Sequence, residues 1–93
     1  MCDHTGWIVR STAGHDRGEL FCVVGQEGEY FFLADGKRRK LSHPKRKKRS
    51  HTEVENRGAF LNAAIQRLQM GESVSDRALR RALAAFRAAT RRV

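Results

Sequence analysis

The chain has 93 residues, a formal net charge of +9 and 40% hydrophobic residues, which is enough for one small domain. No run approaches the roughly 20 apolar residues that a membrane-spanning helix needs, and no apolar stretch of the signal-peptide type follows the polar first residues. The two cysteines, Cys2 and Cys22, do not make a disulfide framework. We therefore expect a cytoplasmic protein.

The charge is distributed very unevenly along the chain. Residues 1–36 carry a net charge of −4, residues 37–52 carry nine basic residues and no acidic one, and residues 53–93 carry a net charge of +4. Positive charge concentrated in this way indicates a polyanionic partner, either a nucleic acid or an anionic membrane surface. The apolar residues near the C-terminus are mostly alanine and have little bulk to bury in a membrane, so we favour a nucleic acid and expect no membrane partner.

Three apolar runs rich in β-branched and aromatic residues predict strands at residues 7–11, 19–24 and 30–34. The turn between the first two contains Gly14, Asp16 and Gly18. Glycine supplies backbone angles that strain other residues, and Asp16 can hold such a loop closed through a hydrogen bond. Asp35-Gly36 is a hairpin signal, which predicts a short, charged edge strand at residues 38–41 that pairs back on residues 30–34.

The remaining part of the chain predicts a linker and two helices. The basic residues 45–49 predict a mobile, extended segment, because a block of like charges cannot form a core. Thr52 and Glu55 fit a capping box, which predicts a helix that runs to Met70 and stops at Gly71. Ser75 is expected to cap a second helix from Asp76 to about Arg92.

Helical spacing predicts which faces of these helices are buried. The apolar stripe of the first helix contains Val54, Leu61, Ala64, Ile65 and Leu68, and that of the second contains Leu79, Ala82, Leu83, Phe86 and Ala89. We expect Leu79, Leu83 and Phe86 to pack on the first helix or on the strands. The arginines Arg80, Arg87 and Arg91 share another face, which is either solvated or part of a nucleic-acid surface.

The strand and turn residues resemble a KOW motif. The pattern is Val9-x-Ser11-x-Ala13-Gly14-x-Asp16-x-Gly18, then Val23-Val24, Tyr30 and Ala34-Asp35-Gly36, and it continues through Arg39, Leu41, Pro44-Lys45, Lys48 and His51. It looks most like the small bacterial KOW-domain RNA-binding proteins, which are related to KOW-bearing large-subunit ribosomal proteins of archaea and eukaryotes. The resemblance implies a five-stranded SH3-like barrel, RNA binding and a role in translation as part of a ribonucleoprotein.

With this resemblance, the expected fold class is α+β, a small SH3-like β-barrel followed by a basic linker and two α-helices. The expected boundaries are 1–43 for the barrel, 44–52 for the linker and 53–93 for a helical hairpin. The resemblance also implies that loops on the side of the Gly14–Gly18 turn contact RNA. The candidate RNA-binding residues are therefore His15, Arg17, Lys37, Arg38, Arg39, Lys40, Lys45, Arg46, Lys47, Lys48 and Arg49.

Aromatic residues offer a second kind of contact. Trp7, Tyr30, Phe31 and Phe32 form either the core of the barrel or a platform on which bases stack. Strand alternation places Tyr30 and Phe32 on one face and Phe31 on the other. The sequence does not decide which face is exposed.

We expect no enzymatic activity, no metal site and no cofactor. The chain has no Cys-x-x-Cys pair and no histidine pair at helical spacing, and no phosphate-cradling loop precedes a helix. The preferred partner is RNA, and the resemblance implies ribosomal RNA or the ribosome. Two alternatives stay open: a protein-interaction adaptor of the transcription or translation machinery that uses the C-terminal helices, and a nonspecific nucleic-acid binder.

Overall fold

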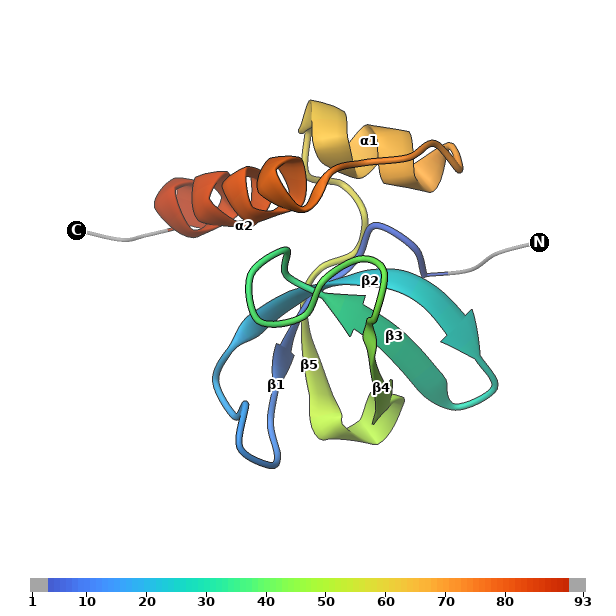
Figure 1. The fold of residues 1–93 in the computed structure, drawn as a ribbon. Coiled ribbons are helices and arrows are strands. Elements are labelled where there is room, and N and C mark those ends of the chain that lie inside the picture. The colour runs from blue at the N-terminus through green and yellow to red at the C-terminus, as the bar shows by residue number, and fades with distance from the viewer. Residues whose placement is uncertain (1–3, 91–93) are drawn as a thin grey trace.

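The computed structural model describes residues 4–90. These residues form a five-stranded antiparallel sheet and two α-helices, which confirms the expected α+β class (Figure 1). The strands are β1 (Ile8–Ser11), β2 (Leu20–Glu27), β3 (Tyr30–Ala34), β4 (Lys45–Lys48) and β5 (Thr52–Asn56), and the helices are α1 (Ala63–Gln69) and α2 (Asp76–Thr90). None of the helices in this part of the chain has the length and apolar character needed to cross a membrane.

The sheet has the strand order β4-β3-β2-β1-β5, so β4 and β5 are its two edges. Only the 3₁₀ turn η1 (Arg49–His51) separates the end of β4 from the start of β5. The sheet is therefore curled, and its two edge strands come together at this end (Figure 1). Between residues 4 and 90 no ladder pairs β4 with β5, so the sheet is not closed.

Two hydrophobic clusters lie on the two faces of the sheet. One face is covered by α1 and α2, and its cluster contains Ile8, Leu20, Cys22 and Ala34 from the strands and Ile65, Leu79, Ala82, Leu83 and Phe86 from the helices. The inner face of the curled sheet holds Val9, Phe21, Val23, Phe31 and Leu33, with Trp7 and Val54 packed against them. Alternate residues of each strand thus enter different clusters, as the pleat of a strand requires.

The predicted edge strand at residues 38–41 is wrong, and so is the predicted mobile linker. Residues 35–44 form an irregular loop, and the strand that pairs with β3 is β4, from Lys45 to Lys48. The segment expected as a linker at 44–52 therefore contributes β4 and η1 to the sheet. Strand alternation explains why so charged a segment can form a strand, because it separates the basic side chains onto two faces of β4.

The predicted start of the first helix is also wrong. Residues 52–56 form β5, which pairs with β1, and α1 begins only at Ala63. Thr52-Glu53-Val54-Glu55-Asn56 alternates half-buried and exposed side chains, the pattern of an edge strand, which outweighs the local capping-box signal. Asn62 caps α1 instead, because its Oδ1 accepts hydrogen bonds from the N–H groups of Ala64 (2.9 Å) and Ile65 (3.4 Å).

The second helix follows the sequence prediction closely. Ser75 Oγ accepts a hydrogen bond from Ala78 N at 3.0 Å, and α2 begins at Asp76. Its predicted C-terminal end near Arg92 lies outside the described residues. Leu79, Leu83 and Phe86 are buried as expected, whereas Ala89 is exposed. On the α1 side Ile65 is buried, but Leu61 precedes the helix and is 86% exposed, so its predicted burial is wrong.

The packing of α2 on the sheet predicts a large cost for removing Phe86, which is 4% exposed and makes an edge-on contact with the ring of Phe60. We expect Phe86→Ala to lower the free energy of unfolding by about 3–5 kcal/mol. Leu61→Ala is the matched control, because the side chain is already in solvent, and we expect it to change stability by less than about 0.5 kcal/mol. Urea unfolding of the three proteins tests this, and equal stabilities would contradict the burial of α2.

Candidate nucleic-acid interface

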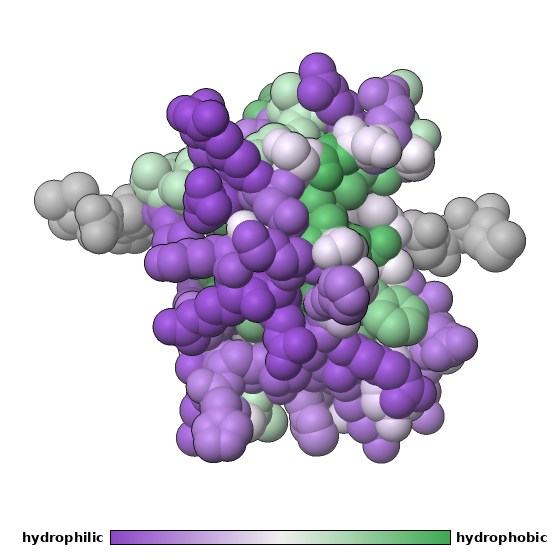
Figure 2. All heavy atoms as spheres, viewed as in Figure 1, coloured by the Kyte–Doolittle hydropathy of each residue, from purple (hydrophilic) through white to green (hydrophobic). Residues whose placement is uncertain are grey.

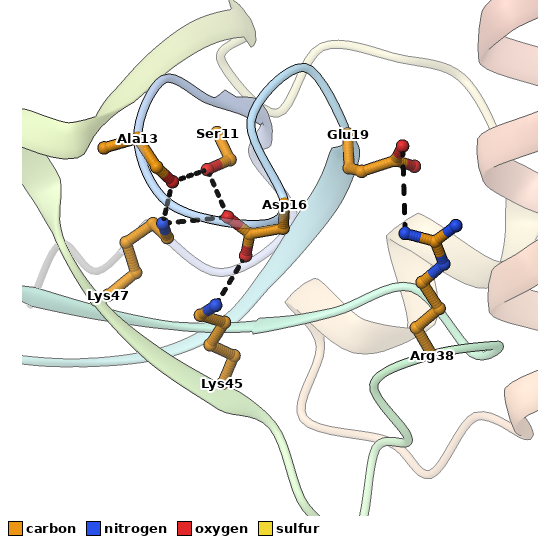
Figure 3. Close-up of polar contacts among 7 residues, drawn as sticks. All are labelled: Ser11, Ala13, Asp16, Glu19, Arg38, Lys45 and Lys47. Carbon is orange, nitrogen blue, oxygen red and sulfur yellow. Dashed lines mark hydrogen bonds and ion pairs between the residues drawn. The ribbon is translucent and has the colours of Figure 1, made fainter.

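A buried ion cluster joins the loop after β1 to strand β4 (Figure 3). Lys45 Nζ lies 2.7 Å from Asp16 Oδ2, and Lys47 Nζ donates hydrogen bonds to Asp16 Oδ1 (3.0 Å) and to the carbonyl oxygen of Ala13 (2.7 Å). Ser11 Oγ donates a further hydrogen bond to Asp16 Oδ1 at 2.7 Å. We call Ser11, Asp16, Lys45 and Lys47 the Asp16 cluster.

Lys45 and Lys47 reach Asp16 together because they are two residues apart on one strand and so project from the same face of β4. The Lys47 side chain is only 8% exposed and that of Lys45 is 25% exposed. Burial alone would raise the pKa of Asp16, but the contacts with Lys45, Ser11 and Lys47 outweigh it and hold the pKa of Asp16 well below its usual range. Asp16 is therefore ionised, and the Lys47 ammonium is bonded inside the protein, so Lys47 is not the exposed phosphate contact expected from the sequence.

The loop at residues 35–44 carries four of the candidate residues and is held by two aspartates. Asp35 Oδ1 accepts hydrogen bonds from the N–H groups of Lys37 and Arg39, each at 2.9 Å. Leu41 N donates to Asp76 Oδ1 at 2.7 Å, which joins the loop to the start of α2. The side chains of Lys37, Arg38, Arg39 and Lys40 are not needed for these bonds and are exposed.

Two adjoining hollows, which share Arg38, bring basic residues from different elements together. The first, about 300 Å³, is lined by His15, Asp16, Phe21, Arg38, Arg39 and Lys45. The second, also about 300 Å³, is lined by Lys37, Arg38, Arg80 and Arg87 with Glu19, Asp35, Leu83 and Ala84. Arg38 and Glu19, which both line the second hollow, form a long ion pair, with 3.9 Å between Arg38 NH1 and Glu19 Oε2.

We call the basic side chains of these hollows the basic surface: His15, Lys37, Arg38, Arg39, Lys45, Arg80 and Arg87. Figure 2 shows strongly hydrophilic residues gathered between α2 and the strands, over the loop that carries four of the candidates. The candidates drawn from the sequence omit Arg80 and Arg87, which the sequence leaves between a solvated face and a binding face. Their spacing of seven residues places both on one side of the helix, but only the fold brings that side to the loop.

The other candidates lie elsewhere. Arg46 and Lys48 project from the opposite face of β4, and the Arg46 guanidinium stacks over the Tyr30 ring at 3.7 Å and approaches Glu27 at 3.9 Å. Arg49 lies in η1, 5.3 Å from the centre of the Phe31 ring. Arg17 is exposed, and its Nε donates to the carbonyl oxygen of Thr12. The basic residues 45–49 thus fall in three places: Lys45 and Lys47 in the Asp16 cluster, Arg46 and Lys48 on the opposite face of β4, and Arg49 in η1.

The turn glycines have the backbone angles expected from the sequence, and the aromatic residues of β3 alternate between the two faces of the sheet as expected. Gly14 and Gly18 both have positive φ, at 84° and 88°. Phe31 is buried in the inner cluster, whereas Tyr30 and Phe32 are half-buried on the other face. Asp16 does hold the loop, but through Ser11 and the β4 lysines rather than through the loop's own backbone, which the sequence did not indicate.

Cys22 is buried in the cluster beneath the helices. Burial raises the pKa of its thiol to about 12, so it is not a nucleophile at neutral pH. From residue 4 to residue 90, no group of three or more His, Cys, Asp or Glu side chains is placed to hold a metal ion. Cys2 lies outside the described residues. No protein-family model matches the chain, and no curated protein matches it.

The Asp16 cluster predicts a pH-dependent contribution to stability. Asp16→Asn leaves two lysines unpaired, one of them buried, and at pH 7 we expect it to cost about 2–4 kcal/mol. Because the folded-state pKa of Asp16 is lower than the unfolded value of about 3.9, this advantage of the wild type is present above about pH 4 and is lost as the pH falls further.

Urea unfolding at pH 7, 4 and 3 measures the gap between the two proteins. Glu19→Gln is the control, because its ion pair with Arg38 is long and exposed, and we expect it to change stability by less than about 0.5 kcal/mol at each pH. A gap between wild type and Asp16→Asn that stays constant with pH would contradict the cluster's role.

The contact between the loop and α2 gives a second prediction, at Gly36. A Cβ atom on Gly36 would lie 2.1 Å from the carbonyl oxygen of Asp76, and Gly36 has a φ of 78°. Gly28 also has positive φ but has open space around it, so Gly28→Ala isolates the backbone strain, about 1–2 kcal/mol. Gly36→Ala should cost a further ~1–3 kcal/mol, because the loop must move away from α2. Thermal or urea unfolding of both variants tests this, and equal losses would show that the contact carries no energy.

Proposed function

We propose that this chain is a non-catalytic RNA-binding protein that holds the phosphate backbone of its target on the basic surface. The observation that carries the proposal is the meeting of exposed Lys37, Arg38 and Arg39 with Arg80 and Arg87 across two adjoining hollows. Lysine and arginine that neutralise phosphates release condensed counterions, which supplies affinity that does not depend on sequence. Arginine also forks onto a phosphate with two parallel hydrogen bonds.

The anchored loop supports this proposal energetically. The backbone of residues 35–44 is fixed by Asp35 and Asp76, so only side chains need to be ordered when a polyanion binds. A surface that is ordered in advance loses less entropy on binding. The Asp16 cluster adds to the positive potential, because one carboxylate faces two lysines and the net charge stays positive.

The identity of the polyanion as RNA, and of the target as ribosomal RNA or the ribosome, rests on the resemblance to KOW proteins. The curled sheet of five antiparallel strands, with its edges joined by η1, is compatible with the SH3-like barrel that the resemblance implies. We extend the proposal to a cytoplasmic protein of translation, with Arg46, Lys48 and Arg49 as further phosphate contacts beyond the basic surface.

A protein-interaction adaptor is the second candidate. Leu61 is 86% exposed and Met70 is 73% exposed, and they flank α1 on either side. A groove of about 640 Å³ between α1 and α2 is lined by alanines together with Arg67, Arg77 and Arg81. Apolar area with arginine at its rim is common in protein interfaces, so these helices would carry the contact.

Salt-dependent binding tests the RNA proposal. We expect a triple variant of the basic surface, Lys37→Gln with Arg39→Gln and Arg87→Gln, to bind a hairpin RNA more weakly than the wild type. Removing three phosphate contacts should reduce the magnitude of the slope of log affinity against log salt by roughly 2 to 3. Arg38 is kept in this variant because it pairs with Glu19.

The matched control is the triple variant Arg67→Gln, Arg77→Gln, Arg81→Gln. It removes the same charge from exposed arginines of the groove between the helices, and we expect the wild-type slope. Equal slopes for all three proteins would contradict the basic surface, and a loss of binding in the control alone would move the contact to the helices. Equal competition by duplex DNA would favour a nonspecific nucleic-acid binder.

A further inference from the structure

A cavity of about 500 Å³ lies beside the basic strand β4, on the side of the sheet that faces the helices. Three separate parts of the chain form its walls: the sheet, the loop before β4, and α1 with the segment after it. Its apolar lining consists of Val24, Phe32, Leu41, Pro44, Leu68 and Val74. The Phe32 ring is half-buried and packs over Gly25, where a Cβ atom would lie 3.4 Å from the ring. We call this hollow the Phe32 cavity.

The lining of the Phe32 cavity does not suit a phosphate. It contains no lysine or arginine among the described residues, and Glu72 is its one charged side chain. A phosphate would be repelled by Glu72. A neutral, planar group that carries N–H donors suits the site, because the apolar walls accept its faces and Glu72, Ser42 and Ser73 can accept its hydrogen bonds.

A basic side chain, that of Arg46, lies beside the cavity, in contrast to its lining. Arg46 is the cross-strand partner of Phe32, so their side chains lie next to each other on one face of the sheet. Lys40, which directly precedes Leu41, is exposed. Lys45 follows Pro44, but its side chain lies on the other face of β4, against Asp16. Arg46 also stacks on Tyr30, which places a flat cationic surface at the edge of the same strands.

An arginine beside a mainly apolar, aromatic hollow is complementary to a nucleotide, whose phosphate is charged and whose base is flat and uncharged. We propose that the Phe32 cavity receives an unpaired nucleobase of the bound RNA, which stacks on Phe32 while the adjoining phosphate lies on Arg46. This inference rests on the proposed RNA-binding function and deepens it, because it assigns base contacts to a place that the basic surface does not include. Single-stranded RNA or a bulge, rather than a continuous duplex, is then the form recognised here.

Abasic RNA separates the base contact from the phosphate contacts. The probes are a single-stranded RNA of about a dozen nucleotides containing all four bases and the same chain with abasic riboses, which has the same phosphates. We expect the intact RNA to bind about fivefold more tightly or better. Phe32→Leu keeps an apolar side chain but removes the aromatic face, so it should lower the affinity for intact RNA to near that for abasic RNA. Phe32→Tyr keeps the ring and is the control that should retain binding.

Photocrosslinking tests the wild-type protein directly and does not depend on whether a variant folds. RNA that carries 5-iodouracil should crosslink to Phe32, and peptide mapping by mass spectrometry identifies the residue. Crosslinks confined to Trp7 or Tyr30 would overturn the inference. So would equal affinities for intact and abasic RNA, or a Phe32→Leu variant that weakens both equally, as expected if the cavity takes an apolar side chain of a protein partner instead.

The two proposals fail in different ways. If neither RNA binds even at low salt, the proposed RNA-binding function fails, and the Phe32 cavity fails with it. If both RNAs bind alike with a steep salt dependence, the basic surface remains and only the Phe32 cavity is excluded.

Discussion

The rest of the structure depends on one carboxylate, that of Asp16, held between Lys45 and Lys47. Five consecutive basic residues repel one another and would stay extended without an acidic partner. Strand alternation sends Lys45 and Lys47 to one side of β4, where Asp16 neutralises part of their charge, and Arg46 to the other, where Tyr30 and Glu27 face it. Residues 45–48 therefore form the edge strand β4. The short turn η1 follows directly and connects β4 to β5, the other edge strand.

Because Asp16 holds β4 in place, it also determines the position of the loop between β3 and β4. The intervening loop, residues 35–44, is attached to the sheet at both ends, and Asp35 and Asp76 bind its backbone in the middle. Two acidic side chains thus fix a segment in which four of the ten residues are lysine or arginine. They bind its backbone N–H groups, so the basic side chains stay exposed. Because Asp76 also begins α2, the loop and the helix carrying Arg80 and Arg87 have a fixed relation.

The sequence predicted correctly the elements that local residues determine. It failed for the elements whose structure depends on a partner distant in the sequence. Apolar runs rich in β-branched and aromatic residues predicted β1, β2 and β3, and the Ser75 cap predicted the start of α2. The β4 strand was missed because its stability comes from Asp16, which is distant in the sequence and which composition does not reveal as a partner. The β5 strand was missed because Thr52 and Glu55 satisfy a capping box as well as a strand pattern, and only pairing with β1 decides between them. The sequence showed the basic residues, but it did not show on which face of the sheet each of them lies.

Basic residues contribute to both stability and the proposed binding, and the burial of each side chain decides which role it has. Exposed charges are screened within about 10 Å at moderate salt, whereas a buried pair is screened far less. Lys47, which is 8% exposed, therefore keeps its bond to Asp16 under conditions that weaken the contacts of Lys37 or Arg39 with a phosphate. Lys45, which is 25% exposed, has both roles. It pairs with Asp16, and it also lines the hollow that contains Arg38 and Arg39. A phosphate bound there would share Lys45 with Asp16, so binding at this position is linked to the same contact that holds the sheet together.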